Sequence, residues 1–228
     1  MSEHWYRHTE WTPEVEAVFE AKVARARFHK PFYLRVQGSK LIERHPDVAI
    51  RLLERCIELE AQDGGFESAV AKAELARAHI ASGDLEPVFR HLESAIEEEV
   101  RNPKTRTSAP YDYASLVALH RREDLYHTAL DLLDRVGEGP FALEAFQYHV
   151  SRALILWDLG SHEDARTSAR QALAYEANRT GPVPGFPEVG VVPRPNPLTE
   201  RASAIVASSG TRGNANENAL RPDSTADH

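Results

Sequence analysis

The sequence predicts an all-α protein, an antiparallel helix-hairpin solenoid with about four helix pairs, an N-terminal helix and an irregular C-terminal tail. Two observations predict this class. Apolar residues recur every three or four positions from Thr12 to about Ala177, as they do along the buried face of a helix. Short breaks at glycine, proline or aspartate separate these stretches, and a short connection forces two helices to lie antiparallel. The sequence has no alternating β-branched runs bounded by turns, so we expect no sheet.

The first helix is expected to begin after Thr12. The motif Thr12-Pro13-Glu14 offers a hydroxyl N-cap, a proline in the first turn and an acid near the positive end of the helix. One buried stripe is expected to follow, formed by Val15, Val18, Phe19, Val23 and Ala26. Further helices are expected at about residues 32–44, 46–60, 66–82, 85–100, 110–122, 124–136, 140–159 and 162–177.

The chain changes character after Asn178. Half of its 14 prolines and five of its 12 glycines lie beyond this residue, and proline removes a backbone donor and restricts the residue before it. We therefore divide the chain into an N-terminal segment (1–11), a repeat domain (12–177), a Pro/Gly-rich extension (178–206) that accommodates one short helix near Leu198 to Val206, and a polar tail (207–228) with the composition of disorder. The extension either caps the last helices or lies in a groove and inhibits it.

The segment from Ala76 to Ile96 resembles the tetratricopeptide repeat. It has a small residue in the first helix, a Gly83-Asp84 turn, and small and large apolar residues at fixed offsets in the second helix. Equivalent positions 49, 88, 129 and 165 are 39, 41 and 36 residues apart, against a family period of about 34. The chain is also similar, in its N-terminal block, to uncharacterised bacterial proteins of this family. The resemblance implies a solenoid whose first helices line a concave groove.

Composition excludes several classes of function. The formal net charge is −8 and the pI is near 5.8, which gives no electrostatic reason to expect binding to nucleic acid or to an anionic membrane. The single cysteine, Cys56, excludes an intramolecular disulfide and is expected to be a core residue. The N-terminus lacks the pattern of a secretory signal, and no apolar run reaches the roughly 18 residues that span a bilayer. A cytoplasmic protein is the expectation.

Catalytic motifs are not evident. The sequence has no phosphate-binding glycine loop, nucleophile elbow, paired-histidine zinc helix or calcium loop. His120 and Asp124 are one helical turn apart and His127 follows, but no convincing fourth ligand accompanies them. We therefore expect no metal, no cofactor and no enzymatic activity.

A binding surface is the favoured hypothesis for function. The resemblance places groove-facing candidates at Arg77, Ile80, Tyr111, Arg121, Arg122, Leu154 and Asp158. Arginines near aromatic residues can clamp a carboxylate or an acidic peptide, whereas the alternative is that they pair with the chain's own acids. The expected partner is a protein or peptide. The rival hypothesis is an enzyme or ligand sensor with a groove site made from His120, Asp124, Arg121 or Tyr111, and a third is self-assembly into a homo-oligomer through the open ends.

Overall fold

The computed structural model describes residues 5–63, 66–182, 184 and 189–208. All regular secondary structure in this part of the chain is helical and it contains no strand, which confirms that the fold is all-α. Its elements are α1 (Pro13–Arg25), α2 (Lys30–Leu41), α3 (Pro46–Asp63), α4 (Ser68–Ser82), α5 (Val88–Arg101), α6 (Ala109–Leu119), the 3-10 helix η1 (Glu123–Leu125), α7 (Tyr126–Val136), α8 (Ala142–Asp158), α9 (His162–Ala177) and α10 (Pro197–Ala207).

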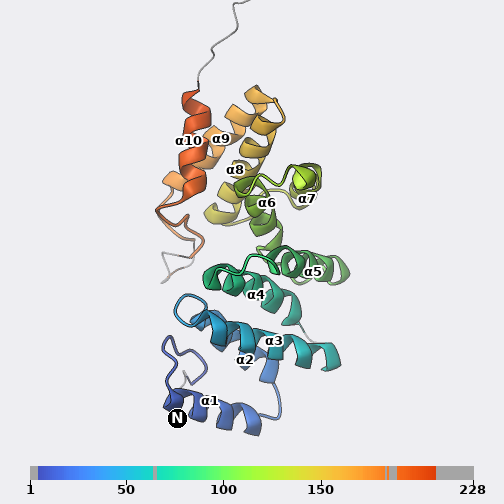
Figure 1. The fold of residues 1–228 in the computed structure, drawn as a ribbon, viewed down its shortest axis with the longest axis vertical. Coiled ribbons are helices and arrows are strands. Elements are labelled where there is room, and N and C mark those ends of the chain that lie inside the picture. Colours follow the sequence, from blue (N-terminus) through green and yellow to red (C-terminus); the bar gives the residue numbers. More distant parts are fainter. Residues whose placement is uncertain (1–4, 64–65, 183, 185–188, 209–228) are drawn as a thin grey trace, which may run out of the picture.

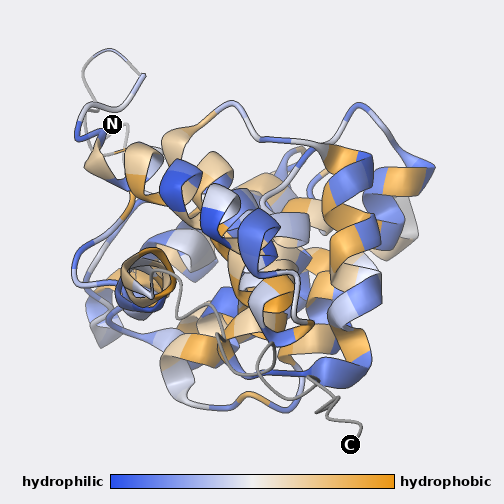
Figure 2. Cartoon of the chain, turned by 90° about the horizontal axis from the view of Figure 1, so that it is seen from above, coloured by the Kyte–Doolittle hydropathy of each residue, from blue (hydrophilic) through white to orange (hydrophobic). Residues whose placement is uncertain are grey.

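Consecutive helices pack against one another along an elongated molecule (Figure 1). The α2–α3, α4–α5, α6–α7 and α8–α9 pairs are each in contact, and α3 also packs on α4, α5 on α6 and α6 on α8. The helices that can be followed in Figure 2 carry both hydrophobic and hydrophilic residues. This mixture is expected where every helix buries one side and leaves another in water.

The hydrophobic core consists of two clusters that meet at α4. The N-terminal cluster includes Leu75 of α4, and the C-terminal cluster includes Ala73 and Ala76 of the same helix. Helix α4 buries five alanines and one leucine: Ala69, Ala71, Ala73, Leu75, Ala76 and Ala78. Small side chains on both sides of a helix let its neighbours approach closely, so α3 and α5 can pack on opposite faces of α4.

Local signals set several helix boundaries. The Thr12 hydroxyl accepts a hydrogen bond from the Val15 backbone N–H at 3.4 Å, which confirms the predicted cap of α1. Val18 is 51% exposed and does not belong to the expected stripe, which runs through Phe19 and Val23 instead. The start of α5 is three residues later than expected because the residue before Pro87 is disfavoured in the helical conformation.

The N-terminal segment packs onto α2. The fully buried Gln37 side chain accepts a hydrogen bond from the His8 backbone N–H at 3.0 Å and donates to the His8 carbonyl at 2.7 Å. The rings of Trp5 and Trp11 lie 5.7 and 5.5 Å from that of Phe19. These aromatic side chains fill the space between α1 and α2 and extend the N-terminal core.

The C-terminal extension packs on the last helix pair. The Leu143 backbone N–H donates to the Gly190 carbonyl at 2.7 Å, and Val192 is fully buried. The short helix that the sequence allowed near Leu198 to Val206 is present as α10, which buries Leu198, Ala202 and Ile205 against α8 and α9. In the residues described, the extension therefore covers the last helix pair. Most of the predicted tail, 209–228, lies outside those residues. None of the helices described is both long and apolar enough to cross a membrane.

Candidate binding site

The first helices of successive pairs are linked by polar contacts. Arg77 of α4 donates to Oδ2 of Asp112 on α6 at 3.1 Å and also to Ser108. Gln147 of α8 donates to Oδ1 of Asp112 at 2.8 Å. Asp112 therefore joins three helices, and both of its carboxylate oxygens already have partners within the chain.

Arg121 and Asp158, two of the predicted groove residues, bind each other. The guanidinium donates to both carboxylate oxygens at 2.9 and 3.1 Å, and the Tyr126 hydroxyl donates to Oδ2 at 2.6 Å. Burial and the adjacent carboxylate raise the pKa of Tyr126 to about 12, so its hydroxyl keeps its proton. Asp158 is a structural anchor between the ends of α6, α7 and α8.

Arg122 is also paired within the chain. Its guanidinium donates to both carboxylate oxygens of Asp124 at 3.0 and 2.7 Å and lies 5.3 Å from the centre of the Phe89 ring. All three arginines that the sequence offered as a ligand clamp therefore contact acids of their own chain. This arrangement is the alternative that the sequence left open.

The three apolar candidates separate into two environments. Ile80 is 39% exposed near the end of α4. Tyr111 and Leu154 are core residues, each 4% exposed, and the Tyr111 hydroxyl donates to the Gly137 carbonyl at 3.1 Å. These two side chains consequently offer no surface to a partner.

The residues of the rival site do not converge. Asp124 and Arg121 are held in separate ion pairs, Tyr111 is buried, and His120 is exposed at the end of α6. Among the residues that the structure describes, no group of three or more His, Cys, Asp or Glu side chains could hold a metal ion. No described contact favours the enzyme or sensor hypothesis at this place.

A groove lies instead between α5 and α7. It comprises two adjoining pockets of about 380 and 340 Å³ that share Ile96, Leu132 and Arg135. Glu93 and Thr128 line one end, and the walls continue to Val100 and Val136 at the other. Since both helices contribute their residues in the same order, α5 and α7 run in the same direction along the groove.

The floor of the groove comes from α6. Tyr113 is buried there, its ring meets that of Phe89 edge-on at 5.6 Å, and its hydroxyl approaches Glu93 at 3.5 Å. Burial, with Glu93 as the next cause, raises the pKa of Tyr113 to about 12. A large aromatic side chain in this position fills the space beneath α5 and α7 and leaves a shallow channel above it.

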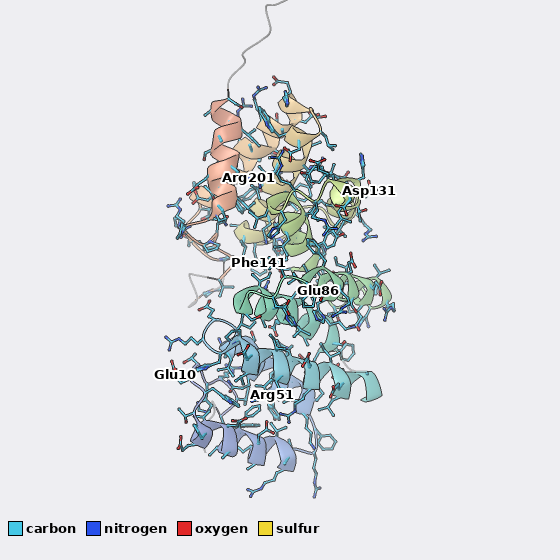
Figure 3. All side chains as sticks on the ribbon, viewed as in Figure 1. Glu10, Arg51, Glu86, Asp131, Phe141 and Arg201 are labelled. Atoms are coloured by element: carbon cyan, nitrogen blue, oxygen red, sulfur yellow. The ribbon has the colours of Figure 1, made fainter. Side chains whose placement is uncertain are left out.

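The rim of the groove includes three charged side chains without an ion pair in the described part of the chain. Asp131 and Arg135 are exposed on α7, and Arg106 is exposed in the connection before α6. None of these three forms an ion pair with another residue in the described part of the chain. Figure 3 places Asp131 on the opposite side of the molecule from Arg201 of α10, and no residue of the described extension lines the groove.

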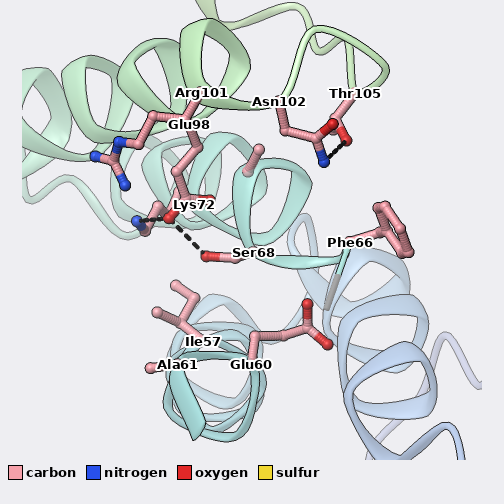
Figure 4. Close-up of a pocket in the computed structure, with 11 residues that line it drawn as sticks. Ile57, Glu60, Ala61, Phe66, Ser68, Lys72, Glu98, Arg101, Asn102 and Thr105 are labelled. Atoms are coloured by element: carbon pink, nitrogen blue, oxygen red, sulfur yellow. Dashed lines mark hydrogen bonds and ion pairs between the residues drawn. The ribbon is translucent and has the colours of Figure 1, made fainter. Parts of the chain in front are cut away.

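A further depression of about 290 Å³ lies between α3 and α5, over the start of α4 (Figure 4). Its polar groups already have partners: Glu98 accepts hydrogen bonds from Ser68 at 3.0 Å and from Lys72, and the Asn102 amide donates to Thr105 at 3.3 Å. Because these contacts satisfy the lining from within, the depression has fewer free groups for a ligand than the α5–α7 groove.

Sequence reasoning did not identify the groove. The repeat register of α5 runs through Val88, Leu92 and Ala95, all buried. Ile96 and Val100 are apolar residues outside that register, spaced one helical turn apart, and they mark a second face of α5. This pair of apolar residues was the feature of the sequence that could have indicated the groove.

Comparison with known proteins identifies no relative. The chain matches no protein-family model, and no match was found among curated proteins or solved structures. The fold and the site by themselves define the class, which is an all-helical protein with a groove between two helices.

Proposed function

We propose that the chain is a protein-interaction module that binds a peptide segment of a partner in the α5–α7 groove. The observation that carries the proposal is the groove itself, which combines apolar walls with exposed rim charges that lack ion pairs in the described chain. Apolar anchors with a polar rim are typical of protein-binding surfaces.

We further propose that the helices form a solenoid of the tetratricopeptide type. Support comes from the four helix pairs in contact and from the equivalent positions Ala49, Val88, Ala129 and Ala165, which are all buried in the second helix of their pair. In such arrays each pair contacts only its neighbours, and the resulting extended surfaces bind other chains.

The shape of the groove favours a peptide over a compact metabolite. Its α5 wall extends from Glu93 to Val100, which is about two turns of helix. Its pockets adjoin along this length and are open to solvent, whereas sites for small ligands enclose most of the ligand surface.

The test is selection of binding peptides from a displayed library, followed by affinity measurements on variants. We expect Val100→Asp to weaken the selected peptides at least tenfold, because Val100 is 63% exposed on the groove wall and a carboxylate there must be desolvated on binding. Val18→Asp, on the exposed side of α1, is the matched control and should leave affinity unchanged. Equal affinities in both variants, with hydrogen-exchange protection outside α5 to α7, would refute the proposed site.

A further inference from the structure

We propose that the groove takes an amphipathic helix with an acidic first turn and a basic last turn, lying antiparallel to α5 and α7. This inference rests on the proposed function, because it names the partner's chemistry at the same groove. We assign the groove to a segment of another protein, and occupation by a second copy is a separate outcome of the test below.

The walls present apolar side chains at helical spacing. Ile96 and Val100 lie one turn apart on α5, and Leu132 and Val136 lie one turn apart on α7. Leu132 is 6% exposed and belongs mainly to the core, so Ile96, Val100 and Val136 provide most of the apolar contact surface. Two ridges with this spacing accept the side chains that a third helix projects at i and i+3 or i+4. An amphipathic helix that lays its apolar face in a groove is a recurring mode of peptide recognition.

The rim charges are segregated along the groove. Glu93, Glu97 and Asp131 line the end nearer the starts of α5 and α7, Glu99 and Arg106 line the far end, and Arg135 lines both pockets. The Glu99 carboxylate already accepts hydrogen bonds from the Thr107 backbone N–H, at 2.8 Å, and from the Thr107 hydroxyl, so Arg106 and Arg135 are the charges at that end that a ligand can engage. A ligand can engage Asp131, Arg106 and Arg135 without breaking an ion pair with another described residue. Complementary charges of this kind fix the register and orientation of a bound segment.

The orientation follows from the electrostatics of helices. A helix is stabilised by acids in its first turn and bases in its last turn. When it lies antiparallel to α5 and α7, its basic end meets Glu93, Glu97 and Asp131, and its acidic end meets Arg106 and Arg135. Its dipole then opposes those of α5 and α7, the two helices that form the walls, and this is the favourable arrangement for dipoles side by side. In the parallel orientation each of these contributions changes sign.

The experiment uses two stapled synthetic peptides of about 18 residues, long enough to be helical. Both share one leucine stripe and one composition. The first has glutamates in the first turn and lysines in the last, and the second has these charges exchanged. Each is titrated against the intact chain and against the double variant Asp131→Arg/Arg135→Asp, whose altered side chains are exposed.

We expect the first peptide to bind the unaltered chain at least fivefold more tightly than the second. The ratio should fall at least fivefold in the double variant, and it should shrink as salt is raised from about 0.05 M to about 0.5 M. A photoreactive group at the last turn of the first peptide should label Thr128 and its neighbours rather than Val136. Because the ratio compares one pair of peptides in two proteins, differences in peptide helicity cancel.

Three results would overturn the inference. If both peptides bind equally and Val100→Asp abolishes both, the groove binds helices without the proposed polarity, and the proposed function stands. If neither peptide binds and the library-selected peptides protect another surface, the proposed function fails as well. A concentration-dependent dimer that Val100→Asp dissociates would assign the groove to a second copy, against the inference.

Discussion

Gly38 shows how a single residue sets the distance between two helices. A Cβ at this buried position of α2 would lie 2.9 Å from Leu53 Cγ and 3.4 Å from the Ala49 carbonyl oxygen. We expect Gly38→Ala to destabilise the fold by about 1–2 kcal/mol, since overpacking of about 1–3 kcal/mol exceeds the gain in helix propensity. Chemical denaturation measures the change. Lys40→Ala, an exposed control on the same helix, should stay within about 0.5 kcal/mol.

His91 makes the fold sensitive to acid. Its ring stacks on that of His79 at 5.3 Å, and the Nδ1 of His79 lies 3.4 Å from Asp84. Burial, and then the neighbouring His79, Arg90 and Lys72, lower the pKa of His91 from 6.5 to about 4. The unfolded chain therefore binds a proton at higher pH than the folded chain does.

It follows that this contribution to stability is fully present above pH 6.5 and is lost as the pH falls towards 4. We expect a loss on the order of 1–2 kcal/mol, because partial exposure of the ring screens the effect. Chemical denaturation at several pH values measures it in the unaltered chain and in His91→Phe. The free energy of unfolding of the unaltered chain minus that of His91→Phe should fall by this amount as the pH is lowered from 6.5 to about 4. A constant difference would show that His91 does not titrate differently on unfolding.

At the scale of elements, helix α10 is held by a buried face that includes one small residue, Ala202. Ala202 is fully buried against α8 and α9, whereas Ala204 on the same helix is exposed. We expect Ala202→Asp to destabilise the docked helix by about 2–4 kcal/mol, because a carboxylate there must be desolvated. Hydrogen exchange of α10 should report its release. Ala204→Asp is the matched control, and equal exchange in both variants would contradict docking of α10 through Ala202.

Helix boundaries could be predicted where their signals are local. Thr12 caps α1 as expected, and Gly83 ends α4 at a φ of 82°, a conformation that glycine adopts without strain. The end of α6 was placed too late because Arg121 turns the chain at a φ of 51°. No sequence rule assigns that conformation to arginine; the residue is held there by its contacts with Asp158.

The candidate site could be predicted only in part. The sequence identified the exposed arginines Arg77, Arg121 and Arg122 but not their partners. The acids that pair with Arg77 and Arg121 lie about 35 residues further along the chain, and the acid that pairs with Arg122 lies two residues away, in the next turn. The α5–α7 groove depends on the separation of two helices that are not consecutive in the chain. Tyr113 of α6 lies beneath both helices and helps to set this separation. The periodicity of side chains within one helix carries no information on the distance between α5 and α7.

At the scale of the whole molecule, the two core clusters predict uneven stability. They share no residue and meet only at α4, whose Leu75 belongs to one and whose Ala76 belongs to the other. Leu53 and Leu133 are both fully buried, one in each cluster. We expect Leu53→Ala and Leu133→Ala to cost about 2–5 kcal/mol each.

Their effects on hydrogen exchange should separate along the chain. Leu53→Ala should raise exchange chiefly in α1 to α3 and Leu133→Ala chiefly in α6 to α9, because a perturbation passes from one pair to the next only through their shared interface. An equal rise throughout the chain in either variant would mean that α4 couples the clusters into one cooperative unit. Separate responses would mean that the α5–α7 groove, which lies on the C-terminal cluster, keeps its shape when the N-terminal helices open.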